Sequence, residues 1–160
     1  MKKSYTLGLY EKAMPGTLSW REKLEAARDA GFDFVEISID ETDQKLARLD
    51  MSTEERLELV RLMAETGVPI RTMCLSGHRK YPLGSSDPET CRRGMEIMEK
   101  AIRLAEDLGI RIIQLAGYDV YYDPSTPKTV ERFGKNLEKA VHMAAKAGVT
   151  MGFETMETEF

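Results

Sequence analysis

Polar side chains that could carry out acid–base or ligand chemistry follow several short apolar runs of this 160-residue chain. The clearest case is Glu154, a carboxylate in the otherwise apolar run 151–154. An isolated buried charge is too costly, so this carboxylate is expected to have a partner if it is buried. Two interpretations stay equally open: a metal ligand, or a carboxylate that is salt-bridged or solvated at a strand end.

A second group, His78-Arg79-Lys80, follows the apolar run 68–75. A single histidine defines no metal site, so a loop histidine is the simpler interpretation of His78 from spacing alone. Arg79 and Lys80 could hold a phosphate through charge-assisted hydrogen bonds. Two adjacent cations are more often solvated surface, and that alternative stays open.

Glu36 and Tyr118 are the remaining candidates. Glu36 lies in the run 32–39 and either points into the interior or pairs with a cation on a neighbouring strand. Tyr118 belongs with Tyr121 and Tyr122 to an aromatic loop, which either lines a sugar pocket or simply packs.

The elements that would position these residues repeat along the chain in the order helix, glycine, strand. Glycine ends helices because it adopts the left-handed backbone conformation at little cost. The apolar runs that follow are short and rich in β-branched or aromatic residues, as buried parallel strands are. The glycines are Gly31, Gly67, Gly109 and Gly148; the predicted strands are 5–10, 32–39, 68–75, 110–116 and 149–154.

The segments between these strands predict helices. Ser52 and Glu55 form a capping box, and Asp87-Pro88 and Thr126-Pro127 each place a capping residue before proline. Two apolar stripes with helical spacing are predicted to face the core. They are Met95, Met98, Ile102 and Ala105, and Val130, Phe133, Leu137, Val141 and Ala144.

Strands that alternate with helices predict a parallel sheet with right-handed crossovers. Either an open doubly wound sheet or a closed eight-stranded barrel fits, and in both the carboxyl ends of the strands carry the site. No glycine-rich phosphate-binding motif follows any strand, which removes the usual evidence for a nucleotide-binding open sheet.

Composition indicates one domain over residues 1–160, with 42% hydrophobic and 31% charged residues. The net charge of −4 argues against a nucleic-acid partner. No apolar run is long enough for a membrane span. Cys74 and Cys91 make no disulfide framework, so we expect a cytoplasmic protein.

Four stretches of the sequence closely resemble the bacterial L-ribulose-5-phosphate 3-epimerases. These are also called L-xylulose-5-phosphate 3-epimerases and, in older naming, hexulose-6-phosphate isomerases. The resemblance covers essentially the whole chain and implies a TIM (β/α)8-type barrel, of which this chain is the N-terminal portion, an incomplete barrel ending after about five strands. The stretches are 7–13, 31–43, 73–85 and 113–122.

The resemblance implies a sugar phosphate as substrate, its epimerisation at carbon 3 through an enediolate, and a place in carbohydrate metabolism such as L-ascorbate degradation. It implies one divalent metal, Mn or Zn, held by a Glu, an Asp, a His and a second Glu. Glu154 matches the first ligand and one of the two acid–base carboxylates, and His78 matches a histidine near the substrate. Glu36, Arg79 and Tyr118 are expected to contact substrate as well.

The matches for the other three metal ligands would lie beyond residue 160. We therefore expect the chain alone to bind metal weakly, to be inactive and to form a homo-oligomer, most simply a dimer. Three alternatives remain: a hexulose-6-phosphate or other aldose–ketose isomerase, a zinc-dependent DNA-repair endonuclease, and a non-catalytic half-barrel module that pairs through its open edges. Two histidines and an acidic balance argue against the endonuclease.

Overall fold

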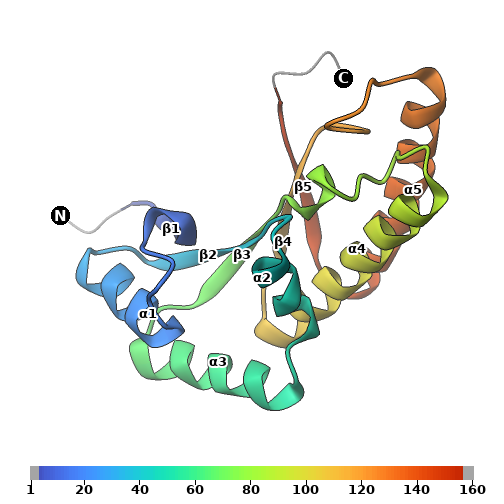
Figure 1. The fold of residues 1–160 in the computed structure, drawn as a ribbon. Coiled ribbons are helices and arrows are strands. Elements are labelled where there is room, and N and C mark those ends of the chain that lie inside the picture. The colour runs from blue at the N-terminus through green and yellow to red at the C-terminus, as the bar shows by residue number, and fades with distance from the viewer. Residues whose placement is uncertain (1–3, 157–160) are drawn as a thin grey trace.

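A computed structural model of the chain describes residues 4–156. Five parallel strands form one curved sheet in the order β1-β2-β3-β4-β5, and the main helices lie on its outer side (Figure 1). The predicted incomplete barrel of about five parallel strands is confirmed. The strands are β1 (Gly8–Tyr10), β2 (Phe34–Ile39), β3 (Ile70–Leu75), β4 (Ile112–Ala116) and β5 (Thr150–Glu154).

The helices begin where the predicted capping residues stand. Ser52 and Glu55 form the capping box, and the side chains of Asp87 and Thr126 accept backbone hydrogen bonds at the starts of their helices. No helix within residues 4–156 combines the length and the apolar character that crossing a membrane requires. The helices are α1 (Trp20–Asp29), α2 (Asp43–Leu46), α3 (Thr53–Thr66), α4 (Pro88–Leu108) and α5 (Pro127–Lys146), and the short 3-10 segments are η1 (Glu11–Ala13), η2 (Ala47–Asp50) and η3 (Gly77–Arg79).

The four strands that follow helices start later than the sequence predicts, and the cause is the way those helices end. The four predicted glycines all have positive φ angles, from 65° to 80°. The residue after the glycine then donates its backbone N–H back into the helix: Phe32 to Ala27 O at 2.9 Å, and Ile110 to Ala105 O at 2.8 Å. Because these backbone N–H groups bond to the preceding helix, they cannot bond to a neighbouring strand, and β2 begins at Phe34.

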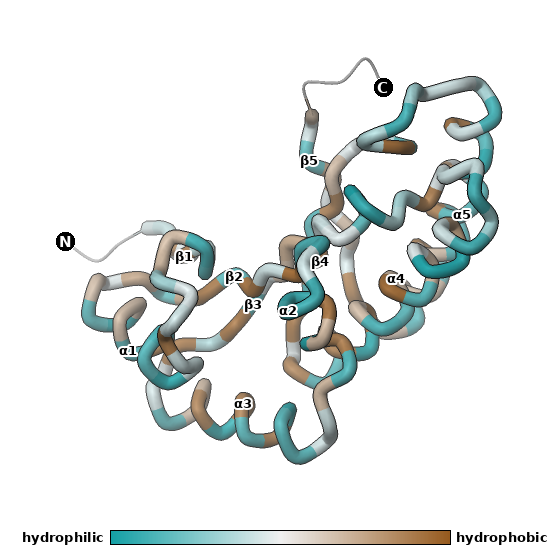
Figure 2. The backbone as a smooth tube through the Cα atoms, in the orientation of Figure 1, coloured by the Kyte–Doolittle hydropathy of each residue, from teal (hydrophilic) through white to brown (hydrophobic). Residues whose placement is uncertain are grey.

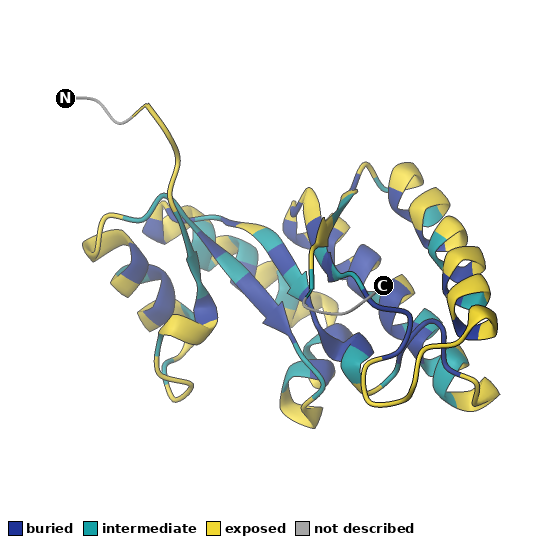
Figure 3. Ribbon diagram, turned by 90° about the horizontal axis from the view of Figure 1, so that it is seen from above, coloured by how far each residue is buried: buried dark blue, intermediate teal, exposed yellow. Residues whose placement is uncertain are grey.

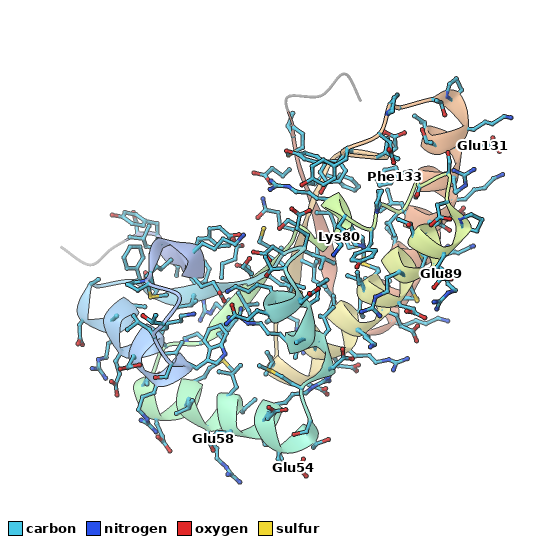
Figure 4. All side chains as sticks on the ribbon, viewed as in Figure 1. Glu54, Glu58, Lys80, Glu89, Glu131 and Phe133 are labelled. Atoms are coloured by element: carbon cyan, nitrogen blue, oxygen red, sulfur yellow. The ribbon has the colours of Figure 1, made fainter. Side chains whose placement is uncertain are left out.

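The apolar core lies between the sheet and the outer helices. Ile37, Met73 and Ile113 on the outer face of the sheet are fully buried, and buried residues concentrate on the strands and on the helix sides that face them (Figure 3). The hydrophobic segments of the chain trace likewise lie mainly on the strands and on the helix sides that face them (Figure 2). The acidic residues Glu54 and Glu58 on α3 point away from the sheet (Figure 4).

The core-facing stripe predicted for α4 is confirmed, whereas the one predicted for α5 is partly wrong. On α5 Val130 and Val141 are 38% and 46% exposed, while Phe133 and Ala144 are buried. The buried face is rotated to include Asn136, whose Nδ2 donates to Leu83 O at 2.8 Å. A satisfied amide can face the core, because its hydrogen bond replaces the one lost to water.

Candidate functional site

Strand register arranges the inner face of the sheet in layers. Glu36 lies between Tyr10 and Thr72 in one layer, because β2 pairs with β1 and β3 at these residues. Cys74 pairs with Gln114 in the next layer, and nearest the carboxyl ends Ala116 is paired with Glu154. Alternate residues of a strand share one face, so the side chains of these layers all face the open side of the half-barrel.

A cavity of about 410 Å³ lies on this inner face at the carboxyl ends of the strands. Three predicted site residues, Glu36, Arg79 and Glu154, line it together, and the predicted residues His78 and Tyr118 do not. The lining residues are Tyr10, Lys12, Glu36, Cys74, Leu75, Ser76, Arg79, Gln114, Ala116 and Glu154.

Glu154 lies at the end of β5, on the exposed side of the cavity. Glu154 is exposed, since within residues 4–156 β5 pairs with β4 alone, and this agrees with the solvated strand end that the sequence left open beside a metal role. Its backbone oxygen accepts from Gly117 N at 3.0 Å, which fixes the strand end. No hydrogen bond or ion pair joins its carboxylate to another described residue, so the carboxylate is available to a ligand in the cavity.

Glu36 on β2 is a second carboxylate that lines the cavity. Its Oε2 accepts a hydrogen bond from Thr72 Oγ1 at 2.7 Å, which orients the half-buried carboxylate toward the cavity. Burial, with a further contribution from the nearby carboxylates of Glu36 and Glu154, raises the pKa of the Cys74 thiol. The thiol therefore stays protonated near neutral pH, which fits an inert rather than a nucleophilic cysteine.

Arg79 is a half-buried cation without an acidic partner among the described residues. Its guanidinium carbon lies 5.0 Å from the centre of the Tyr121 ring, and its Nε is buried with no hydrogen-bond partner in that part of the chain. Burial opposes its charge, but the neighbouring Tyr121, Tyr118 and Glu41 raise the pKa of the guanidinium. The hydroxyl of Tyr118, which is 3% exposed, lies against this guanidinium and contributes to the same shift.

His78 lies beneath Arg79 in η3 rather than in the cavity wall. It is 7% exposed and its Nε2 lies 3.1 Å from Gly94 O on α4, so Nε2 carries the proton. Burial lowers the pKa of His78 to about 4, which keeps the ring neutral. The contact ties η3 to α4, and the predicted contact of His78 with substrate stays a prediction.

Two further charged groups lie at this end of the sheet that the sequence analysis did not select as site residues. Lys12 Nζ lies 2.6 Å from Asp40 Oδ2, and although burial acts against the charge, Lys12 and Thr42 hold the pKa of Asp40 at about 2. The signal was present, since Lys12 and Tyr10 end the first strand in the same way as Glu154 ends the fifth.

The second group surrounds Glu11, which is 1% exposed. Its carboxylate accepts from Lys45 Nζ and from Arg48 Nη1, the latter at 2.7 Å, and Lys23 Nζ lies 3.9 Å away. Trp20 packs against two of the cations, with Arg48 4.9 Å and Lys23 5.2 Å from its ring centre. We call these four charged residues the Glu11 network.

The described residues offer few side chains that could bind a metal ion together. Within residues 4–156 no three His, Cys, Asp or Glu side chains lie close enough together to hold an ion. Divalent metals in proteins are held by several side chains at once. The divalent ion that the resemblance implies therefore does not fit the described residues by themselves, which offer Glu154 as one carboxylate.

Comparison with known proteins agrees with this geometry. Residues 24–160 match the family model of the xylose isomerase-like TIM barrel. An L-ribulose-5-phosphate 3-epimerase, UlaE, from Escherichia coli O139:H28 is 52% identical over 157 residues, covering 98% of this chain and 55% of the relative. The chain thus spans about half the length of the curated relatives it matches.

Solved structures show the same arrangement of strands and helices. A structure of L-ribulose 3-epimerase is 25% identical, with a TM-score of 0.70 over 92% of this chain and 48% of the other. The D-psicose 3-epimerase from Clostridium cellulolyticum H10, solved with D-tagatose, is 17% identical, with a TM-score of 0.77 over 92% of this chain and 51% of that one. Because the family model covers most of its residues, the chain belongs to the xylose isomerase-like TIM barrel family.

Proposed function

We propose that this chain forms part of a sugar-phosphate 3-epimerase that interconverts L-ribulose 5-phosphate and L-xylulose 5-phosphate. The observation that carries the proposal is the cavity in which the Glu154 carboxylate and the Arg79 guanidinium, neither of them in an ion pair within residues 4–156, share the carboxyl ends of the strands. Identity of 52% with an L-ribulose-5-phosphate 3-epimerase supports the same substrate class.

The two charges suit the two ends of a ketose phosphate. Inversion at carbon 3 needs one group that removes the proton from one face and a second group that delivers a proton to the other face. The Glu154 carboxylate, which has no partner among the described residues, can serve as one of these two acid–base groups. A guanidinium without an acidic partner can bind a phosphate through several N–H donors. Glu36, oriented by Thr72, can accept a hydrogen bond from a sugar hydroxyl between them.

We propose a divalent metal, Mn or Zn, as the cofactor of the whole protein, with Glu154 as one ligand. Such an ion would supply a Lewis acid for the negative charge that develops as the proton leaves carbon 3. Its remaining ligands must come from outside the described residues, since these contain no group of three suitable side chains.

Localisation and assembly are further parts of the proposal. Free cysteines at 74 and 91 support a reducing compartment, the cytoplasm. Within residues 4–156 one edge of β5 has no partner strand and Phe153 is 50% exposed; both support association with more protein, since exposed strand edges invite pairing. Size-exclusion chromatography with light scattering checks for the predicted dimer, and a concentration-independent monomer would contradict it.

Solvent deuterium tests the reaction. The whole protein is incubated with L-xylulose 5-phosphate in deuterated water, and the products are analysed by NMR. We expect deuterium at carbon 3; label found solely at carbons 1 and 2 would instead establish an aldose–ketose isomerase.

Variants then test the assigned carboxylate. We expect Glu154→Gln to abolish exchange at carbon 3, because the amide cannot accept the proton. Glu131→Gln, which changes an exposed glutamate on α5, is the matched control and should leave exchange intact. Full exchange by Glu154→Gln would remove this residue from the mechanism.

A further inference from the structure

Glu41 is the acidic residue that could neutralise Arg79, yet the two form no ion pair. Both belong to loops at the carboxyl ends of neighbouring strands, Glu41 after β2 and Arg79 after β3. Glu41 lies close enough to contribute to the raised pKa of the Arg79 guanidinium. A carboxylate and an arginine that meet can form a short, bidentate hydrogen-bonded pair.

The Glu41 carboxylate is instead hydrogen-bonded to Tyr122. Its hydroxyl lies 2.9 Å from Glu41 Oε1 and 3.2 Å from Oε2, a contact between residues 81 positions apart in the chain. The ring of Tyr122 is 67% exposed, so apolar burial gives little reason for its position. The hydrogen bond to Glu41 is the polar contact that holds it.

A cluster of three aromatic rings connects Arg79 to the contact between Tyr122 and Glu41. Tyr118 and Tyr121 have ring centres 5.1 Å apart, and Tyr121 and Tyr122 have theirs 4.9 Å apart in an edge-to-face arrangement. Arg79 lies over the face of Tyr121, the middle ring. The loop after β4 therefore contacts the Arg79 guanidinium through Tyr121 and binds the Glu41 carboxylate through Tyr122.

We propose that Tyr122 is a positioning residue that keeps Glu41 engaged and so leaves Arg79 open to the phosphate of the substrate. The inference rests on the proposed role of Arg79 in anion binding. Without the Tyr122 hydroxyl, Glu41 turns to Arg79 and competes with the phosphate as an intramolecular anion.

The test measures binding of inorganic phosphate to the whole protein by titration calorimetry, together with KM and kcat for the sugar phosphate. We expect Tyr122→Phe to weaken phosphate binding about tenfold, a typical size for coupling between two sites, and to raise KM with little change in kcat. Tyr5→Phe, at another exposed tyrosine, is the matched control and should bind phosphate as the unmodified protein does.

The double variant Tyr122→Phe/Glu41→Gln separates competition from loop anchoring. An amide cannot neutralise Arg79, so we expect the double variant to regain phosphate affinity to within about threefold. If it stays as weak as Tyr122→Phe, the tyrosine merely anchors its loop and the inference is overturned; an unaffected Tyr122→Phe also overturns it.

Arg79→Gln distinguishes this inference from the proposed function. Phosphate binding lost in Arg79→Gln but unaffected in Tyr122→Phe overturns the positioning role alone. Phosphate binding unaffected in Arg79→Gln overturns both the anion-binding role and the inference. Rescue by Glu41→Gln in a protein that does not turn over the sugar phosphate supports the inference while the proposed reaction fails.

Discussion

Replacing Glu11 with glutamine removes the one acid of the Glu11 network and leaves three cations together. The side chains of Lys23, Lys45 and Arg48 are 5%, 15% and 14% exposed, so water cannot readily solvate their charges. Removing one partner of a buried ion pair typically costs about 3–5 kcal/mol. Against a total stability of about 5–15 kcal/mol, that is a large fraction.

Urea unfolding and thermal unfolding, both followed by circular dichroism, measure this cost. At about 2–4 °C per kcal/mol for a domain of this size, we expect the melting temperature of Glu11→Gln to fall by roughly 6–20 °C. Glu131→Gln is the control: its pair with Lys135 is 65% and 69% exposed, and exposed pairs contribute about 0–1 kcal/mol. A loss for Glu11→Gln no larger than the loss for the control would refute this account of the network.

The pH dependence gives an independent check of the same residue. Burial acts against the Glu11 charge, but Arg48 and Lys45 lower the pKa of its carboxyl below the ordinary 4.5. A lowered carboxyl pKa contributes stability that is fully present above about pH 4.5 and is lost as the pH falls through the folded-state pKa. The difference in unfolding free energy between the unmodified protein and Glu11→Gln should therefore shrink in acid.

Two further predictions follow from close packing and from burial. Gly84→Ala would place a Cβ 2.6 Å from Asp119 O, so we expect a loss of about 1–3 kcal/mol in urea unfolding; Gly134→Ala, on α5 with open space around it, should instead be neutral or stabilising by up to ~1 kcal/mol. Burial lowers the pKa of His78 from 6.5 to about 4, so it contributes a loss of stability as the pH falls from 6.5 toward 4. His78→Gln should flatten that part of the stability–pH curve, and an unchanged slope would contradict the burial argument.

Local signals account for the part of the fold that the sequence predicts well. The ends of helices depend on a few neighbouring residues, so the cap at Ser52 and the left-handed Gly67 could be predicted. The strand starts could not be placed correctly, because Phe32 and Ile110 satisfy their N–H groups in the preceding helix. Sequence periodicity does not report that competition between helix closure and sheet pairing.

The site was predictable to the extent that it depends on strand ends. Glu36, Arg79 and Glu154 meet in one cavity because parallel strands bring their carboxyl ends to one edge. The burial of His78 against Gly94 depends on how η3 packs on α4, which residue types do not reveal. The Glu11 network was also beyond sequence reasoning, because its partners lie 34 and 37 positions away in the chain.

The order of the strands in the sheet bears on how the protein is made. Within residues 4–156 each strand pairs with its immediate neighbours along the chain, from β1 to β5, so a new β/α unit meets its partner edge soon after it leaves the ribosome. Short separations between paired segments favour rapid folding, and N-terminal parts fold first during synthesis. The contact of Tyr122 with Glu41 is different, since it spans 81 positions and must wait for β4. This contact between the loops after β2 and β4 therefore forms later than the pairing of β1 with β2 and of β2 with β3.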